Sequence, residues 1–88
     1  MKKKFENIAK VVRKCRKEAK LSQEKLSKSL GYKNGQFISN LERGKCGLPA
    51  NKINITSELL NIDSMRIVDA LVLDHAKYLE DMSECLQA

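Results

Sequence analysis

Four polar side chains occupy one side of a short helix predicted near the middle of the chain. Over residues 35–43 the apolar residues Phe37, Ile38 and Leu41 recur at spacings of three and four, which indicates a buried helix face. The positions left to face outward are Gln36, Ser39, Asn40 and Arg43. Amide side chains can form paired hydrogen bonds with adenine in a DNA groove, and a serine hydroxyl can bond either base edge. We expect base contacts from Gln36, Asn40, Ser39, Asn34 and Lys33.

Start and stop signals place another short helix before this one. Ser22 is a good N-cap for a helix that ends at Gly31, because a serine hydroxyl can accept a backbone amide and glycine readily ends a helix. Asn34 can cap the next helix, over residues 35–43, and Gly44 can end it. Two short helices joined by such a turn form a helix-turn-helix unit.

The rest of the chain also has helical periodicity. Apolar residues at spacings of three and four predict a first helix over residues 5–19, a fourth over residues 51–61 and a long fifth helix after residue 62. Leu, Ile, Val and Ala dominate the apolar residues, and only 5% of the chain is aromatic. We therefore expect an all-α fold of five helices in these 88 residues, divided into residues 1–62 and a C-terminal helix at residues 63–88.

Positive charge is concentrated in the first half of the chain. Residues 1–48 hold 14 Lys and Arg against 4 Asp and Glu, a net charge of +10, whereas residues 49–88 hold 3 against 7, a net charge of −4. The sequence pI is about 9.4. A strongly basic half indicates a polyanionic partner, although charge alone does not separate DNA, RNA and membrane lipid.

Several classes of protein are not expected from this sequence. The three cysteines lack a Cys-x-x-Cys or Cys/His cluster, which favours reduced thiols in a cytoplasm over disulfides or a zinc site. We predict no signal peptide and no membrane span, because no apolar run is long enough. No catalytic triad or glycine-rich phosphate loop is visible, so we expect neither an enzyme nor a cofactor. Positive charge beside Cys46 could lower the pKa of its thiol.

Four parts of the sequence together form a specific pattern. They are Arg16, LSQEKLSKSLG at 21–31, ISNLERG at 38–44, and Pro49 with ITSELLNI at 55–62. Over about residues 8–62 the chain thus resembles the Cro/repressor-type (XRE-like) helix-turn-helix regulators of phages and bacteria. The resemblance implies a lambda-repressor-like fold and a repressor that binds a double-stranded DNA operator, in the cytoplasm of a bacterium or a phage-infected host. Six residues separate Gly31 from Ile38, one more than is common in the family, so either the turn is longer or the helix begins earlier.

The resemblance assigns roles to further residues. Arg16 and Glu42 match positions that form an ion pair between the first and third helices, for which an Arg–carboxylate fork is well suited. Gln23 matches a position that contacts the DNA backbone and braces the first reading residue. Arg43 and Lys45 lie where the family touches flanking phosphates, and a glycine at position 35 allows close backbone approach. The expected phosphate contacts are Gln23, Ser22, Arg43, Lys45 and Gly35, with Lys2, Lys3, Lys4, Lys25 and Lys28 as further candidates.

The C-terminal helix carries an apolar stripe at heptad spacing. Its members are Met65, Val68, Val72, His75, Leu79, Met82 and Leu86. Regulators of this type usually bind DNA as twofold dimers, so we expect a homodimer interface. The interface residues we predict are Val68, Val72, His75, Leu79 and Met82. His75 has no second ligand nearby in the sequence, which argues against a metal site.

Two alternatives to this dimer remain open at the level of sequence. The stripe could pack only within its own monomer. The helix could instead dock a different protein, which would make the chain a protein-interaction module of an antitoxin-like or partner-binding kind. The basic and polar segment at residues 33–45 favours the DNA-binding interpretation, because a module used only for protein interaction has no need of it.

Overall fold

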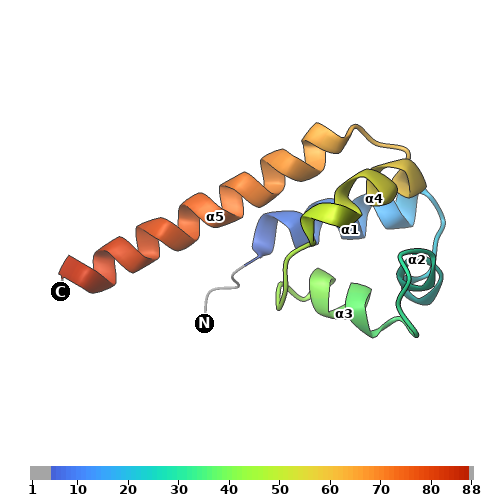
Figure 1. Ribbon diagram of the computed structural model, residues 1–88, viewed down its shortest axis with the longest axis horizontal. Helices are drawn as coiled ribbons and strands as arrows, with labels where there is room; N and C mark the ends of the chain where they lie inside the picture. The colour runs from blue at the N-terminus through green and yellow to red at the C-terminus, as the bar shows by residue number, and fades with distance from the viewer. Residues whose placement is uncertain (1–4, 88) are drawn as a thin grey trace.

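The computed structural model describes the backbone of residues 5–87, and the side chains of residues 5–77 and Leu79. Its elements, in chain order, are α1 (Glu6–Glu18), α2 (Gln23–Ser29), α3 (Gln36–Glu42), the 3-10 turn η1 (Ala50–Lys52), α4 (Ile53–Leu60) and α5 (Ser64–Gln87). No strand occurs in this described backbone, and the predicted all-α fold of five helices is confirmed. Figure 1 shows α5 running along one edge of the domain and extending beyond it.

A single core joins all five helices. Every helix contributes at least one residue to it, such as Ile8 and Val12 on α1, and all of its residues are almost completely shielded from solvent. The other buried residues of this cluster are Cys15, Leu26, Leu30, Ile38, Leu41, Leu48, Leu60, Ile67 and Ala70. The first turns of α5 therefore share the core of the helix-turn-helix segment. The division into residues 1–62 and residues 63–88 stays a prediction.

Four of the helices end in the same way, with a residue in the left-handed region. Gly31 after α2 has φ of 98° and Gly44 after α3 has φ of 76°, so both predicted stop signals are confirmed. In each case the two amides beyond the helix donate back to carbonyls of its last turn. Lys20 after α1 (φ 59°) and Asn61 after α4 (φ 55°) adopt the same conformation without being glycine. For Lys20 this costs roughly 1 kcal/mol.

A buried carboxylate fastens α5 to the beginning of α1. Asp74 of α5 accepts the backbone amides of Asn7 (2.8 Å) and Ile8 (3.0 Å), and also the Asn7 side-chain amide (3.0 Å). Phe5, the N-cap residue of α1, makes no capping bond with its own side chain. Asp74 thus caps α1 from a helix more than sixty residues away in the sequence, and this contact sets the direction in which α5 leaves the domain.

Candidate nucleic-acid interface

The starts of α2 and α3 lie directly against each other. Ser22 caps α2 as predicted, because its Oγ accepts the Lys25 amide at 3.0 Å. A Cβ added to Gly35, at the start of α3, would lie 3.1 Å from both the backbone nitrogen and the Cα of Glu24. Gly35 has an ordinary φ of −75°, so the absence of a side chain matters here for close packing and not for backbone conformation.

The turn between these helices corrects one prediction. We expected Asn34 to cap a helix over residues 35–43, but the N-cap residue is Gly35 and α3 begins at Gln36. Asn34 Oδ1 instead accepts the Gln36 amide at 2.9 Å, so its side chain still satisfies one free amide of the first turn. The additional residue between Gly31 and Ile38 therefore lengthens the turn, and α3 does not begin earlier.

Aromatic and cationic contacts hold the longer turn in place. The rings of Tyr32 and Phe37 stack with their centroids 4.1 Å apart and their planes 9° from parallel. Lys52 Nζ lies 5.6 Å from the Tyr32 ring centroid and donates to the Leu30 carbonyl at 2.7 Å. Lys52, which sequence reasoning missed, thereby satisfies a carbonyl at the end of α2 and packs over the turn.

A buried polar cluster connects α1, α2 and α3. Arg16 Nε donates to Glu42 Oε2 at 2.6 Å, and a second guanidinium nitrogen donates to Glu42 Oε1 at 3.1 Å, so the ion pair that we predicted is present. A further Arg16 nitrogen donates to the Leu21 carbonyl at 2.8 Å. Gln23 Nε2 also donates to Glu42 Oε1, at 3.2 Å. The side-chain nitrogen of Gln23 is therefore bonded to Glu42. The resemblance implied instead that Gln23 would brace the first residue that reads a base.

The residues predicted to read bases lie at the outer face of α3 and the turn before it. Gln36, Asn34 and Lys33 are exposed, while Ser39 and Asn40 are half-buried. Gln36 Nε2 donates to Asn40 Oδ1 at 2.9 Å, so these two side chains are paired with each other. A hollow of about 440 Å³ opens beside them, and its lining residues are Gln23, Glu24, Asn34, Gly35, Gln36 and Ser39. The fold thus brings five of the predicted contact residues together around one hollow.

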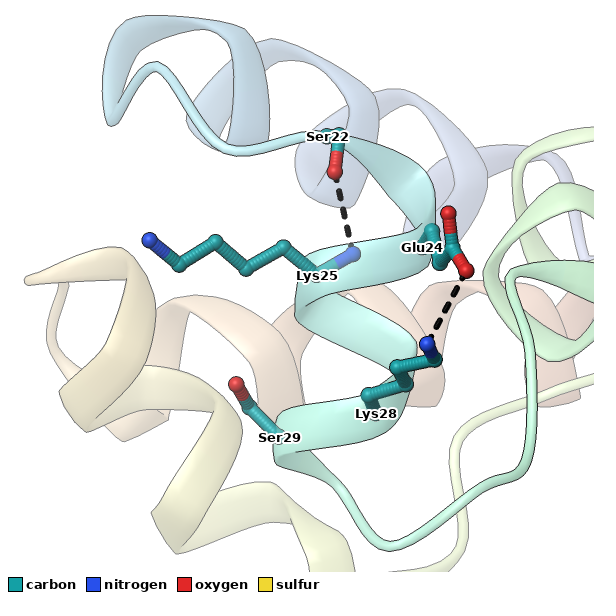
Figure 2. A pocket seen from close by; sticks show the side chains of 5 residues that line it. All are labelled: Ser22, Glu24, Lys25, Lys28 and Ser29. Carbon is teal, nitrogen blue, oxygen red and sulfur yellow. Dashed lines mark hydrogen bonds and ion pairs between the residues drawn. The ribbon is translucent and has the colours of Figure 1, made fainter.

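The remaining predicted phosphate contacts, Ser22, Arg43 and Lys45, do not line this hollow. Arg43 and Lys45 are exposed just after α3. Ser22 lines a second hollow, of about 480 Å³, on the outer side of α2 together with Glu24, Lys25, Lys28 and Ser29. Figure 2 shows the Lys25 side chain extended away from the Glu24–Lys28 pair. The candidates Lys2, Lys3 and Lys4 lie outside the described residues.

Glu24 is a feature of this surface that sequence reasoning did not single out. It lines both hollows, and its carboxylate pairs with Lys28 at 3.1 Å. An acidic residue in the first turn of a helix has an ordinary structural reason, because it complements the helix dipole. The same carboxylate also places a negative charge beside the predicted phosphate contacts.

The heptad stripe on α5 faces away from the domain. Met65, Val72 and Leu79 are each more than half exposed, His75 is exposed and Val68 is half-buried. The side chain of Met82 lies outside the described residues. The helix buries its opposite side, with Ile67, Ala70 and Asp74. Within the described side chains, the alternative that the stripe packs inside its own monomer is therefore not supported.

The thiol of Cys46 lies in the loop after α3 and is half-buried. Burial raises the pKa of the Cys46 thiol, so the expectation that the neighbouring positive charge lowers it is wrong. Among the side chains that the structure describes, no three His, Cys, Asp or Glu residues gather in a way that could hold a metal ion. No helix within residues 5–87 is long and apolar enough to cross a membrane.

Comparison with known proteins adds independent evidence on this segment. Residues 12–48 match the protein-family model described as helix-turn-helix. Over this segment the chain is similar to helix-turn-helix domains of the Cro/repressor type. The matched segment runs from the middle of α1 to the loop after α3, and so contains the Arg16–Glu42 pair and the whole outer face of α3. This helix-turn-helix match supports a DNA-binding regulator of transcription. A comparison with curated proteins found no match.

Proposed function

We propose that this protein is a sequence-specific regulator that binds a double-stranded DNA operator as a homodimer and acts as a repressor. The observation that carries the proposal is the exposed amide and hydroxyl face of α3. It stands on a helix whose other side is fixed in the core by Ile38 and Leu41. Amide and hydroxyl groups held on a rigid helix suit the donor and acceptor pattern of the major groove. The proposed readers are Gln36, Asn40, Ser39, Asn34 and Lys33.

Phosphate contacts on both sides of this face would give affinity without sequence information. The proposed contacts are Gln23, Ser22, Gly35, Arg43 and Lys45. The exposed side chains of Arg43 and Lys45 support this assignment most directly, because each can replace a counterion on the DNA. Glu24 lines the hollow beside Gln36, and its negative charge opposes the contacts with DNA phosphates. Glu24→Gln should therefore strengthen binding to all duplexes alike.

The two-sided apolar character of α5 supports the homodimer. One side of the helix is buried in its own domain through Ile67 and Ala70, and the opposite side exposes Met65, Val72 and Leu79 in a row. A row of exposed apolar residues on a helix marks an interaction surface in most soluble proteins. A second copy of the same helix fits the heptad spacing and would place two α3 helices on half-sites about 34 Å apart. A dimer that occupies its operator excludes other proteins from the same grooves, which is the simplest route to repression.

Selection of bound duplexes from a random library tests the proposed function. We expect an enriched operator with two symmetric half-sites roughly one helical turn apart. Gln36→Ala and Asn40→Ala should weaken operator binding and leave non-specific binding nearly unchanged. Lys45→Ala should weaken all duplexes and reduce the salt slope by about 1. Asn54→Ala, an exposed asparagine on α4, is the matched control and should change neither quantity.

Light scattering coupled to size exclusion tests the dimer separately. Val72→Glu should convert a dimer to a monomer, whereas Ile55→Glu, which replaces an exposed apolar residue on α4, should leave the mass unchanged. A monomeric native protein that also ignores duplex DNA at low salt would contradict the proposal. That result would favour the protein-interaction module, with a different protein on α5.

A further inference from the structure

Two asparagines bind Gln36, one at its backbone amide and one at its side chain. Its backbone amide donates to Asn34 Oδ1 at 2.9 Å, and its side-chain Nε2 donates to Asn40 Oδ1 at 2.9 Å. Gln36 remains exposed on the outward side of α3 while it makes both bonds. A side chain that is already held in one position loses less conformational entropy when it binds a ligand. Gln36 is therefore prepared for a contact, although it is at the surface.

The brace on Gln36 comes from its own helix and not from α2. Gln23, which the family resemblance marked as the bracing residue, donates its Nε2 to Glu42 Oε1 at 3.2 Å, where Arg16 also donates. Asn40 lies four residues after Gln36, so the two side chains meet on one face of α3. This chain thus uses Asn40 for the task that the resemblance assigned to Gln23.

We infer that Gln36 recognises an adenine in the major groove and that Asn40 acts by positioning Gln36, in place of the reading role proposed for Asn40 above. The inference deepens the proposed function and rests on it. A primary amide has two N–H groups and one oxygen. The bond to Asn40 uses one N–H, so the oxygen and the other N–H remain as a neighbouring acceptor and donor.

Only one base matches this remaining pattern with two hydrogen bonds. In the major groove, adenine presents the N7 acceptor beside the N6 donor. Guanine presents two acceptors, cytosine one donor, and thymine one acceptor beside its methyl group. Gln36 can therefore satisfy both of its free amide groups on adenine while the bond to Asn40 stays in place.

The test uses the operator selected above and the full chain. Each adenine of the half-sites is replaced in turn by 7-deazaadenine, which has C–H in place of N7 and keeps Watson–Crick pairing. Kd is measured by fluorescence anisotropy at one fixed salt concentration, because affinity depends on salt. For the native protein, one adenine in each half-site should lose about 5-fold or more in affinity, the lower range for one base-specific contact. For Gln36→Ala, the two bases at that position should bind equally well.

Two variants of Asn40 separate positioning from reading. Asn40→Asp keeps an oxygen that accepts from Gln36 but loses the side-chain N–H groups, whereas Asn40→Ala loses both. The added charge weakens binding to all duplexes, so the readout is the ratio of the two Kd values, adenine against 7-deazaadenine. We expect Asn40→Asp to keep the native ratio and Asn40→Ala to reduce it toward 1. Asn54→Ala is again the matched control and should keep the ratio.

The outcomes distinguish this inference from the proposed function. An equal loss of the ratio in Asn40→Asp and Asn40→Ala would overturn the positioning role, because it would assign the reading to the Asn40 N–H groups. An operator whose adenines all tolerate 7-deazaadenine, or whose response survives in Gln36→Ala, would overturn the adenine contact and still support sequence-specific binding. If no duplex is enriched at all, the proposed function fails and the inference fails with it.

Discussion

Two carboxylates buried at helix junctions are held in different ways. Glu42, with a side chain 5% exposed, is bound by the side chains of Arg16 and Gln23. Asp74, 3% exposed, is bound by two backbone amides and by the side chain of Asn7. Both satisfy the requirement that a buried charge be hydrogen-bonded. They differ in whether the partner is a particular residue type or the main chain itself.

The two carboxylates hold different helices in position. Glu42 joins α3 to α1 and α2, so it fixes the proposed reading helix within the helix-turn-helix domain. Asp74 joins α5 to α1, so it fixes the helix that carries the exposed heptad stripe. One carboxylate therefore positions the proposed DNA contact and the other positions the proposed dimer contact. Changes at the two sites should be separable by experiment.

Removal of Glu42 should have the largest effect on stability. Glu42→Ala leaves the Arg16 guanidinium, itself only 12% exposed in its side chain, without a carboxylate. Loss of one partner of a buried pair typically costs about 3 kcal/mol or more. We expect the free energy of unfolding in urea to fall by about that amount at a fixed protein concentration, which matters because a dimer couples stability to concentration.

A second variant shows whether the loss at Glu42 belongs to the unpaired charge. Replacing both partners, as in Arg16→Met with Glu42→Leu, removes the charges together and should regain at least about half of the lost stability. If the double variant is less stable than Glu42→Ala, the packing of this site and not the ion pair carries the energy.

Removal of Asp74 should have the next largest effect. Asp74→Ala leaves the amides of Asn7 and Ile8 without their acceptor, and loss of such a cap costs roughly 2 kcal/mol. Hydrogen exchange at these two amides should become faster than in the native protein. Since two of the three donors to Asp74 are main-chain amides, no second side-chain replacement restores the whole loss. The folded Asp74→Ala variant should keep its affinity for a duplex with a single half-site, because α3 is not held by Asp74, whereas Glu42→Ala should lose that affinity. An equal loss on the half-site in both variants would contradict the separation of the two junctions.

This contrast also explains what the sequence could predict. The Ser22 cap and the stop signals Gly31 and Gly44 were predictable from residue types beside the helix ends, and the Arg16–Glu42 pair from the resemblance to Cro/repressor-type regulators. Asp74 was not predictable, since every helix start offers free amides and nothing in the sequence marks which one an aspartate will reach.

The start of α3 was misplaced for a related reason. Its position depends on the contact of Gly35 with the Glu24 backbone, and that contact exists only after the helices have packed. The bond between Gln36 and Asn40 was within reach of sequence reasoning, because an amide pair four residues apart is a known stabilising arrangement on a helix. From the sequence, both residues are expected to contact bases, and the bond between them is not predicted.

Ser27 extends the comparison to a buried polar group without a partner. Ser27 of α2 is completely buried, and its hydroxyl has no hydrogen-bond partner within the described part of the chain. Ser27→Ala should therefore raise the free energy of unfolding by about 1 kcal/mol, the cost of an unsatisfied hydroxyl. Ser57 is the matched control, because its buried hydroxyl donates to the Asn54 carbonyl at 2.7 Å. Ser57→Ala should lower stability, and a gain in both variants would show that burial alone decides the sign.

The smallest effect is expected at Glu6, an exposed carboxylate beside the Asp74 junction. Hydrogen bonds from Lys10, at 3.2 Å, and from Lys77 of α5, at 3.3 Å, hold the pKa of Glu6 below its ordinary value of 4.5. Because the folded state has the lower pKa, Glu6 stabilises the fold above pH 4.5, and this contribution is lost as the pH falls through the folded-state pKa. Glu6→Gln should thus be slightly less stable than the native protein at neutral pH, and the two should converge as the pH falls through the folded-state pKa of Glu6. Glu18→Gln on the same helix controls for the change in net charge, and a gap for Glu6→Gln that stays constant in acid would contradict the assignment.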